Sequence, residues 1–381
     1  MYIPFNRLYF SGRELACIKD CLKRNSIAGN GYYTGKVQDF MASRFKAEKV
    51  FLTTSATSAL EMASLLLSLK PGDEVIMPSF TFVSTANAVM LRGAKPVFAE
   101  IDPRTLNIDP EDVKEKISPH TRAIIPVHYA GVACDMDSLL AISREYGLFI
   151  IEDAAQGVNA LYKGRYLGTI GHIGCYSFHG TKNYSCGEGG ALLLNGLGKD
   201  MLKKAEYIWE KGTNRSSFLR GEIDRYTWME IGSSYTPSDI LAAYLYAQLQ
   251  DMDMITEKRE KIYYNYLNSL REYEKKGLLK LPYLPDYAVS NYHIFYIIFA
   301  HKNTRDYVQE KLKQRGIESA SHYVPLHLSP MGKRLGYRPG ELPLTEKLAD
   351  GLLRLPLYPD MTAGEQEYVI ENLRKVLHEL E

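Results

Sequence analysis

The sequence predicts an α/β fold with a doubly wound, mostly parallel sheet and a smaller second domain. Short apolar runs alternate with helical patterns between about Val50 and Asn195, which is the order that a parallel sheet requires. One of these runs, residues 148–153, is apolar and ends in two carboxylates, as expected for a strand that is buried on both faces. The chain has 381 residues, enough for one large domain and a smaller one.

The composition is that of a soluble globular protein, with 45% hydrophobic and 24% charged residues. A net charge of +1 gives no bulk attraction to nucleic acid or to acidic membranes. Residues 1–6 lack the basic start and apolar core of a signal peptide, and no apolar run approaches the length of a membrane span. The five cysteines form no Cys-x-x-Cys pair, so we expect a cytoplasmic protein without a metal site.

The first candidate site along the chain is a hydroxyl-rich turn between a predicted strand and a predicted helix. Residues 53–58 read Thr-Thr-Ser-Ala-Thr-Ser, and a helical pattern starts at Leu60. Free backbone N–H groups and hydroxyls at a helix N-terminus bind phosphate. Ordinary capping by Ser or Thr is the alternative, although it does not need so many hydroxyls. No Walker-type or Gly-x-Gly-x-x-Gly motif occurs here, so a nucleoside triphosphate or dinucleotide loop is excluded.

The second candidate is Asp153, at the end of the strand predicted over residues 148–153. Ligands of open α/β sheets bind at the carboxyl ends of the strands. An acid there can cap the next helix or bind a metal ion. It can also form a salt bridge to the pyridinium nitrogen of a cofactor, which keeps the ring protonated and makes it a better electron sink.

The third candidate is Lys182, which lies in a glycine-rich segment, residues 177–190, just after another short hydrophobic run. Lysines that serve solubility usually lie on amphipathic helices, whereas this lysine is held by a tight backbone near a strand end. A Schiff base to a carbonyl compound needs a lysine that is positioned in this way. The alternative is a loop lysine in a turn that the glycines merely shape.

These segments are part of a longer set of motifs, residues 54–60, 71–78, 81–85, 126–131, 152–156, 177–190 and 322–327. With them the chain resembles the DegT/StrS family of nucleotide-sugar aminotransferases, which are pyridoxal-phosphate (PLP) enzymes of fold type I. The resemblance implies PLP as the cofactor. It also implies a large domain with a mostly parallel, seven-stranded sheet flanked by helices, and a smaller C-terminal α+β domain.

The resemblance assigns a role to each candidate residue. Lys182 and Asp153 are the catalytic residues: Lys182 binds PLP as a Schiff base and moves protons, and Asp153 pairs with the ring nitrogen. Gln156 is expected to donate to the phenolic oxygen, and Phe82 to stack on the ring, with a core phenylalanine as the alternative. The remaining assignments are Ala56 (through its N–H), Thr57 and Ser177 for the phosphate, and His322, Tyr323, Asn30 and Gly31 for the sugar nucleotide. A plain turn is the alternative for Asn30 and Gly31.

Near Pro237 the alternating strand and helix patterns give way to a long helical pattern. Thr236 is expected to be a helix N-cap with Pro237 at the first helical position, and a long helical pattern continues towards Tyr273. We place a domain boundary near Asp251. Residues 1–250 are then the large PLP-binding domain, N-terminal arm included, and residues 251–381 are the small C-terminal domain.

Within the family, the chain is most similar to transaminases that make dTDP-4-amino-4,6-dideoxygalactose. The segments behind this are residues 171–174, 211–216, 224–228 and 231–235. They predict amination of dTDP-4-keto-6-deoxyglucose with L-glutamate as the amino donor. Amination at C3 and an equatorial 4-amino product stay open as alternatives.

Single residues favour or disfavour other functional classes on the same fold. Lys182 argues against the family's dehydratases, which carry histidine there. Cys186 is the nearest candidate thiol for a PLP lyase or desulfurase, and a catalytically silent regulator is the remaining alternative. A homodimer with the active site at the subunit interface is expected. Ser234, however, stands where many members carry an Asn or Lys that holds the phosphate across that interface.

Overall fold

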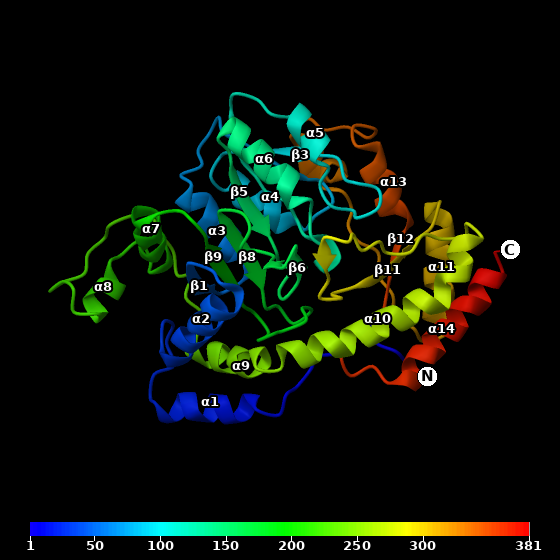
Figure 1. Cartoon of the computed structure of the whole chain (residues 1–381), viewed down its shortest axis with the longest axis horizontal. Coiled ribbons are helices and arrows are strands. Elements are labelled where there is room, and N and C mark those ends of the chain that lie inside the picture. The colour runs from blue at the N-terminus through cyan, green and yellow to red at the C-terminus, as the bar shows by residue number, and fades with distance from the viewer. Residues whose placement is uncertain (381) are drawn as a thin grey trace.

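The computed structural model describes residues 1–380 and has a seven-stranded sheet at its centre (Figure 1). The strand order is β1-β9-β8-β5-β4-β2-β3. β9 runs antiparallel to both neighbours, whereas the other neighbouring strands pair in parallel. The strands are β1 (Lys49–Thr53), β2 (Glu74–Pro78), β3 (Lys95–Ala99), β4 (Thr121–Ile124), β5 (Phe149–Asp153), β8 (Ile173–Ser177) and β9 (Gly190–Leu194). The predicted mostly parallel α/β sheet is confirmed.

Helices cover both faces of this sheet, so its strands are apolar on both sides. Neighbouring strand residues alternate between two core clusters: Ile124 packs with one, and Ala123 and Ile125 pack with the other. This is the period of two that a pleated strand imposes. One cluster includes α2 (Tyr32–Phe45), α6 (Met136–Tyr146) and α9 (Asp239–Leu249), and the other includes α3 (Ala56–Leu66), α4 (Val83–Met90) and α7 (Lys199–Trp209).

A separate apolar cluster forms the core of the C-terminal part. There the helix α10 (Met252–Lys275) packs with α14 (Ala363–His378) and with the antiparallel pair β11 (Phe295–Ile298) and β12 (Leu352–Leu355). In Figure 1, α10 runs from the central sheet to these elements. The other C-terminal helices are α11 (Lys302–Gln314), α12 (Pro330–Arg334), α13 (Pro343–Gly351) and the 3-10 turn η2 (Leu326–Leu328).

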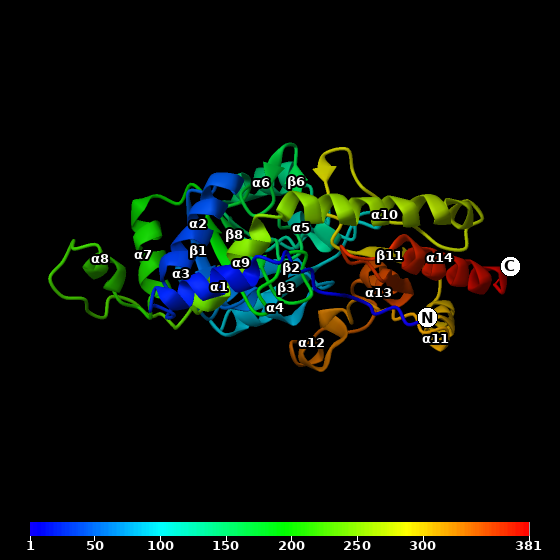
Figure 2. The same cartoon turned by 90° about the horizontal axis from the view of Figure 1, so that it is seen from below.

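The remaining elements of residues 1–380 are short. They are α1 (Glu14–Lys23), α5 (Pro110–Glu115), α8 (Arg215–Leu219), the 3-10 turn η1 (Tyr129–Gly131), and a small sheet of β6 (Leu161–Tyr162), β7 (Arg165–Tyr166) and β10 (Ala288–Val289). In both views α8 projects from the body of the molecule (Figures 1 and 2). None of the helices in the described part of the chain is both long and apolar enough to span a membrane.

The helices after Pro237 differ from the prediction in two respects. Ser238, not Thr236, is the N-cap, and its hydroxyl accepts a hydrogen bond from the amide of Ile240 (3.2 Å). The long helical pattern is also interrupted before α10, because Asp251 turns out of the helix and its carboxylate binds Tyr9 and Arg13. The break falls at the predicted boundary, but the division into residues 1–250 and 251–381 stays a prediction.

The N-terminal arm, residues 2–7, lies against the C-terminal part of the chain (Figure 2). The amide of Ile3 donates to the carbonyl of Gly316 (2.8 Å), and Ile3 is bridged in parallel with Ile317. Arg7 forms an ion pair with Glu365 (3.1 Å). The arm therefore joins the smaller part of the molecule to the large one.

Candidate active site

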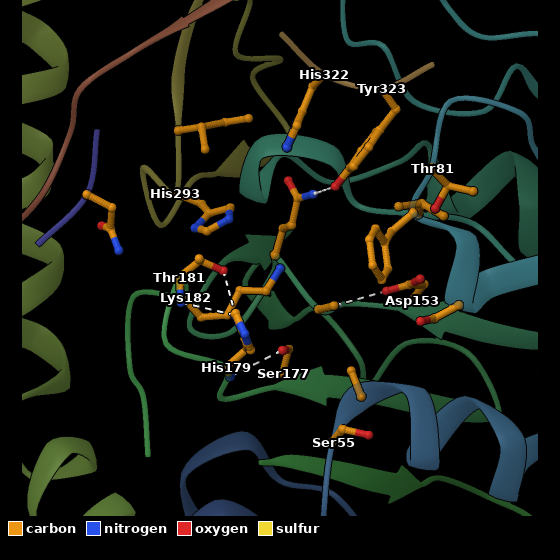
Figure 3. Close-up of a pocket in the computed structure, with 18 of the residues that line it drawn as sticks. Ser55, Thr81, Asp153, Ser177, His179, Thr181, Lys182, His293, His322 and Tyr323 are labelled. Carbon is orange, nitrogen blue, oxygen red and sulfur yellow. Dashed lines mark hydrogen bonds between the residues drawn. The ribbon is translucent and has the colours of Figure 1, made fainter. Parts of the chain in front are cut away.

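A pocket of about 500 Å³ opens at the carboxyl ends of the central strands (Figure 3). β5 ends at Asp153 and β8 ends at Ser177, and both side chains line the pocket. This is the edge at which open α/β sheets bind ligands. The opposite wall comes from the C-terminal part of the chain and includes His322 and Tyr323.

Lys182 points into this pocket, between Ser177 and the pair His322 and Tyr323 (Figure 3). Its loop is closed by backbone hydrogen bonds from Lys182 to His179 (2.9 Å) and from Gly180 to Gly187 (2.8 Å). Gly187 has a φ of 84°, a conformation that glycine adopts without strain. Burial lowers the pKa of the Lys182 amine to about 8, although the negative charge of Asp153 opposes the shift. A larger fraction of the amine is then unprotonated near neutral pH than at the ordinary lysine pKa of 10.5, and the unprotonated amine is the nucleophile.

Asp153 is buried and is held by two donors. The hydroxyl of Thr85 donates to Oδ2 (2.8 Å), and the amide of Ala155 donates to Oδ1 (3.2 Å). Thr85 is itself hydrogen-bonded to Thr81 (2.8 Å). Burial raises the pKa of Asp153, while these two hydrogen bonds and the charge of Lys182 oppose the rise. A turn at Ala155 and Gln156, and no helix, follows Asp153, so Asp153 does not cap a helix.

The strand end at Asp153 is supported by a buried network around Glu152. Glu152 accepts a hydrogen bond from Nε2 of His128 (2.9 Å). Nδ1 of His128 accepts from the amide of Cys134 (3.1 Å), so the histidine is the neutral Nε2–H tautomer. The Glu152 carboxylate also accepts from three backbone amides, those of Gly168, Ile170 and Gly171. His128 is therefore a support of the site and does not line the pocket.

The hydroxyl-rich turn predicted as a phosphate site forms the N-terminus of α3. Ser55 is the N-cap and accepts from the amide of Ser58 (3.0 Å). The amides of Ala56 and Thr57 have no acceptor among residues 1–380, and both residues line the pocket. Gly190 lets β9 pass close to this turn, because a Cβ there would lie 2.3 Å from the carbonyl carbon of Ser55. Two free N–H groups at a helix N-terminus are suited to bind an anion.

Aromatic side chains line part of the pocket. Phe82 is 57% exposed and its ring lies 6.4 Å from that of Tyr323, so it is not the core phenylalanine of the alternative interpretation. Gln156 accepts from the amide of Ala130 (2.8 Å) and donates to the Tyr323 hydroxyl (3.0 Å). His322 stacks on Tyr323 with ring centroids 4.0 Å apart.

These groups fit PLP. The free amides at the start of α3 and the Ser177 hydroxyl suit its phosphate, and the exposed face of Phe82 is an apolar surface for its ring. Lys182 and Asp153 bring an amine and a carboxylate to the same pocket, which are the groups that the aldehyde and the ring nitrogen of PLP require. A PLP-dependent aminotransferase is the class that this fold and site define.

Comparison with known proteins identifies the family. Residues 10–374 match the DegT/DnrJ/EryC1/StrS aminotransferase family, and the chain belongs to it. It is 34% identical to the spore coat polysaccharide biosynthesis protein SpsC of Bacillus subtilis over 90% of both chains.

Two solved structures share the fold. The aminotransferase TlmJ from Streptoalloteichus hindustanus is 29% identical, with a TM-score of 0.90 over the whole of both chains. The PLP form of the putative sugar aminotransferase Spr1654 from Streptococcus pneumoniae also covers both chains completely, with a TM-score of 0.92 at 24% identity.

Two residues predicted to contact the substrate lie outside the pocket of the single chain. Asn30 donates to Glu210 (2.7 Å) and lies near Ser216. Gly31 is the N-cap of α2, and a Cβ there would lie 2.6 Å from Asp239. Gly31 leaves room for Asp239, which accepts from the amides of Tyr33 and Thr34 in α2. Contact of Asn30 and Gly31 with the substrate stays a prediction. Ser234 is also exposed and away from the pocket.

The lining residues that the sequence analysis missed include three with basic side chains, Arg259, His293 and Arg354. Arg354 interrupts the apolar run of β12, and a lone arginine in a buried strand is a detectable signal. No such signal marks Arg259 or His293 in the sequence. Arg259 lies on a long helix, where an arginine is usually exposed. The structure also weighs against a cysteine-based reaction, because burial raises the pKa of the Cys186 thiol to about 12.

Proposed function

We propose that this protein transfers the amino group of L-glutamate to a nucleotide-linked 4-keto-6-deoxyhexose. The observation that carries the proposal is the convergence of Lys182, Asp153 and the N-terminus of α3 on one pocket. Membership of an aminotransferase family and the similarity to SpsC, whose name places it in polysaccharide biosynthesis, favour a sugar as the acceptor. A pocket of about 500 Å³ is in the size range of sites that enclose ligands larger than an amino acid.

When bound, PLP supplies the carbonyl that takes up the amino group and an electron-withdrawing ring. We assign the reacting amine to Lys182, whose lowered pKa lets it attack a carbonyl and then accept and return a proton. Asp153 holds a proton on the ring nitrogen, because its buried carboxylate stabilises the positive charge there. Both are catalytic residues in this proposal.

The other lining residues bind and orient. We assign the phosphate to the amides of Ala56 and Thr57 and to the hydroxyl of Ser177. Gln156 uses one N–H for Tyr323, which leaves its second N–H for the phenolic oxygen. Phe82 covers one face of the ring and excludes water from it.

The particular sugar and stereochemistry rest on the resemblance of the more distant segments. We propose that dTDP-4-keto-6-deoxyglucose is converted to dTDP-4-amino-4,6-dideoxygalactose. The outcome depends on which face of C4 the Lys182 amine can reach when it delivers the proton. His322 and Tyr323 line the side of the pocket opposite Ser177, so we assign them to the sugar nucleotide.

The test is a reaction of the purified holoenzyme with L-glutamate and dTDP-4-keto-6-deoxyglucose. Proton NMR of the product should show a small coupling between H3 and H4, because an axial amine places H4 equatorial. A large coupling would show the equatorial product, and an amine at C3 would appear at a different proton. A simple 2-oxo acid that outcompetes the sugar nucleotide would contradict a sugar acceptor altogether.

We also propose a cytoplasmic homodimer with the active site at the subunit interface. The segment around α8, which projects from the body, exposes the large apolar side chains Phe218, Leu219, Tyr226, Trp228 and Ile231. Exposed apolar clusters of this kind favour burial against another surface. Sedimentation equilibrium should give twice the mass of the chain, and Trp228→Ser should weaken the association. A monomeric wild-type protein with full activity would contradict the proposal.

A further inference from the structure

The pocket contains a cation that the proposed roles do not use. Arg354 lies on β12, between Leu353 and Leu355, which are both buried. Burial lowers the pKa of its guanidinium, but an arginine remains charged in proteins. No salt bridge to Arg354 is present within residues 1–380. A desolvated charge without a counter-charge is unfavourable unless a ligand supplies one.

The contacts of the guanidinium leave one of its edges free. Nη1 donates to Nε2 of His322 (2.6 Å), and Cζ lies 4.6 Å from the centre of the Phe5 ring. Nε is buried and has no hydrogen-bond partner among the described residues, and Nη2 also makes no hydrogen bond to them. Nε and Nη2 together form the edge that binds a carboxylate through two parallel hydrogen bonds.

His322 fixes the direction of this edge. Because its Nε2 accepts from Arg354, the proton of the neutral ring is on Nδ1, which lies 3.2 Å from the Tyr129 hydroxyl. Burial and the charges of Arg354 and Lys182 lower the pKa of His322 to about 2. The ring is therefore a neutral acceptor over the whole physiological range and does not compete for an anion.

The second arginine of the pocket is already occupied. Arg259 donates to three backbone carbonyls, those of Tyr292, His293 and Leu357. Its guanidinium thus links α10 to the segments around β11 and β12. Arg354 is then the arginine of the pocket whose donors remain available to a ligand.

The position of Arg354 favours a carboxylate of the amino donor over the cofactor phosphate and the nucleotide diphosphate. The phosphate site at α3 lies on the Ser177 side of the pocket, whereas Arg354 is bonded to His322 on the other side. Arg354 also lowers the pKa of Lys182, so the two charges lie close enough to interact. An amino acid carries its carboxylate on the carbon that bears the amine, whereas the diphosphate of a sugar nucleotide is separated from C4 by the sugar ring.

We propose that Arg354 binds a carboxylate of the amino donor through Nε and Nη2, with His322 as the residue that positions it. The donor and the sugar nucleotide occupy the pocket in turn, so this role of His322 is compatible with its assignment to the sugar nucleotide. The identity of the donor rests on the proposed function, because glutamate is part of that proposal. The carboxylate site itself is a property of Arg354 and is tested without the sugar.

The test compares the two half-reactions and the binding of an unreactive dicarboxylate. In the Arg354→Gln holoenzyme, the rate constant for reaction with L-glutamate should fall about 100-fold, the loss expected for a charge-assisted, two-bond contact. The dissociation constant of glutarate, measured by calorimetry on the PLP form, should rise by a similar factor. Reaction of the amine form with dTDP-4-keto-6-deoxyglucose should change less than about threefold, since a contact absent from a step does not affect its rate.

Two variants serve as controls. Arg7→Gln removes an exposed arginine of the arm that is paired with Glu365 and does not line the pocket, so glutarate binding should be unchanged. Arg354→Lys keeps the charge but loses the fork, and should bind glutarate with intermediate affinity. It also serves as the test protein if circular dichroism shows that Arg354→Gln does not fold.

The outcomes separate this inference from the proposed function. Unchanged glutarate binding in Arg354→Gln, or a loss confined to the sugar half-reaction, would overturn the carboxylate site. An equal loss in both half-reactions would also overturn it, because the residue would then only support the pocket. A wild-type enzyme that binds glutarate through Arg354 but does not aminate the sugar nucleotide would instead refute the proposed acceptor and leave the carboxylate site standing.

Discussion

Thr85→Val removes the strongest hydrogen bond to Asp153 without changing the volume of the side chain. The Thr85 hydroxyl lies 2.8 Å from Oδ2 of a buried carboxylate. A hydrogen bond to a charged group contributes ~1.5–3 kcal/mol, and a pKa shift of one unit corresponds to about 1.4 kcal/mol. Because this bond opposes the rise that burial causes, its loss should raise the pKa of Asp153 further.

The shift is measurable as a change in the pH dependence of cofactor binding. Cofactor affinity should depend on ionised Asp153, so the pH below which apoenzyme loses affinity for PLP should move upward by about 1–2 units in Thr85→Val. Fluorescence titrations of apoenzyme with PLP between pH 4.5 and 8 give the pH at which half of the affinity is lost, which is the midpoint to compare.

The matched control is Thr81→Val. Thr81 bonds to Thr85 but not to Asp153, and the comparison cancels the titration of PLP itself. Equal midpoints for wild type and Thr85→Val would show that the carboxylate is not the ring-nitrogen partner or is not held by Thr85.

Four further predictions follow from the same site. Lys182→Ala should abolish turnover, because no other amine lines the pocket beside it, while PLP still binds non-covalently; turnover near the wild-type rate would exclude Lys182 as the reacting amine. Asp153→Asn should slow the proton-transfer step in single-turnover experiments by orders of magnitude and weaken PLP binding less, and an unchanged rate would make Asp153 structural. In apoenzyme the Lys182 pKa of about 8 lies below its ordinary 10.5, so the unfolded chain binds more protons between these values. The stability of the wild type relative to Lys182→Met should therefore rise over that window by on the order of 3 kcal/mol in urea titrations, and a flat difference would contradict the burial of the amine. Arg259→Met should lower the free energy of unfolding by at least about 3 kcal/mol, because three buried carbonyls lose their donor, whereas Arg271→Met, on the exposed face of the same helix, should change it by less than about 0.5 kcal/mol.

The parts of the fold that could be predicted depend on local patterns. The apolar run that ends at Asp153 forms β5, and the turn before Leu60 forms the N-terminus of α3. Both are decided by strand period, burial and capping chemistry within about ten residues. The sequence predicts a domain boundary near Asp251 but not the interruption of the helix there, because that interruption depends on Tyr9 and Arg13, which are distant in the sequence.

The site shows the same division. Lys182 and Asp153 lie in segments with a clear chemical pattern, and they line one pocket. Asn30 and Gly31 lie in an equally suggestive turn, but in the single chain they lie against Glu210 and Asp239 and not in the pocket, so their role stays a prediction. Arg354 was overlooked although it interrupts an apolar run. Its lack of an acidic partner, however, is a property of the assembled structure and not of a motif.

The contacts of the N-terminal arm imply that it docks late in folding. Phe5 and Asn6 line the pocket, and the amide of Phe5 donates to Glu318, 313 positions away in the sequence. Closing so long a loop costs more entropy than the local contacts of the central sheet. During synthesis the arm emerges before residues 316–318, so it must wait for them before it can dock. The pocket is thus completed by contacts between two segments that lie far apart in the sequence, after the central sheet has formed.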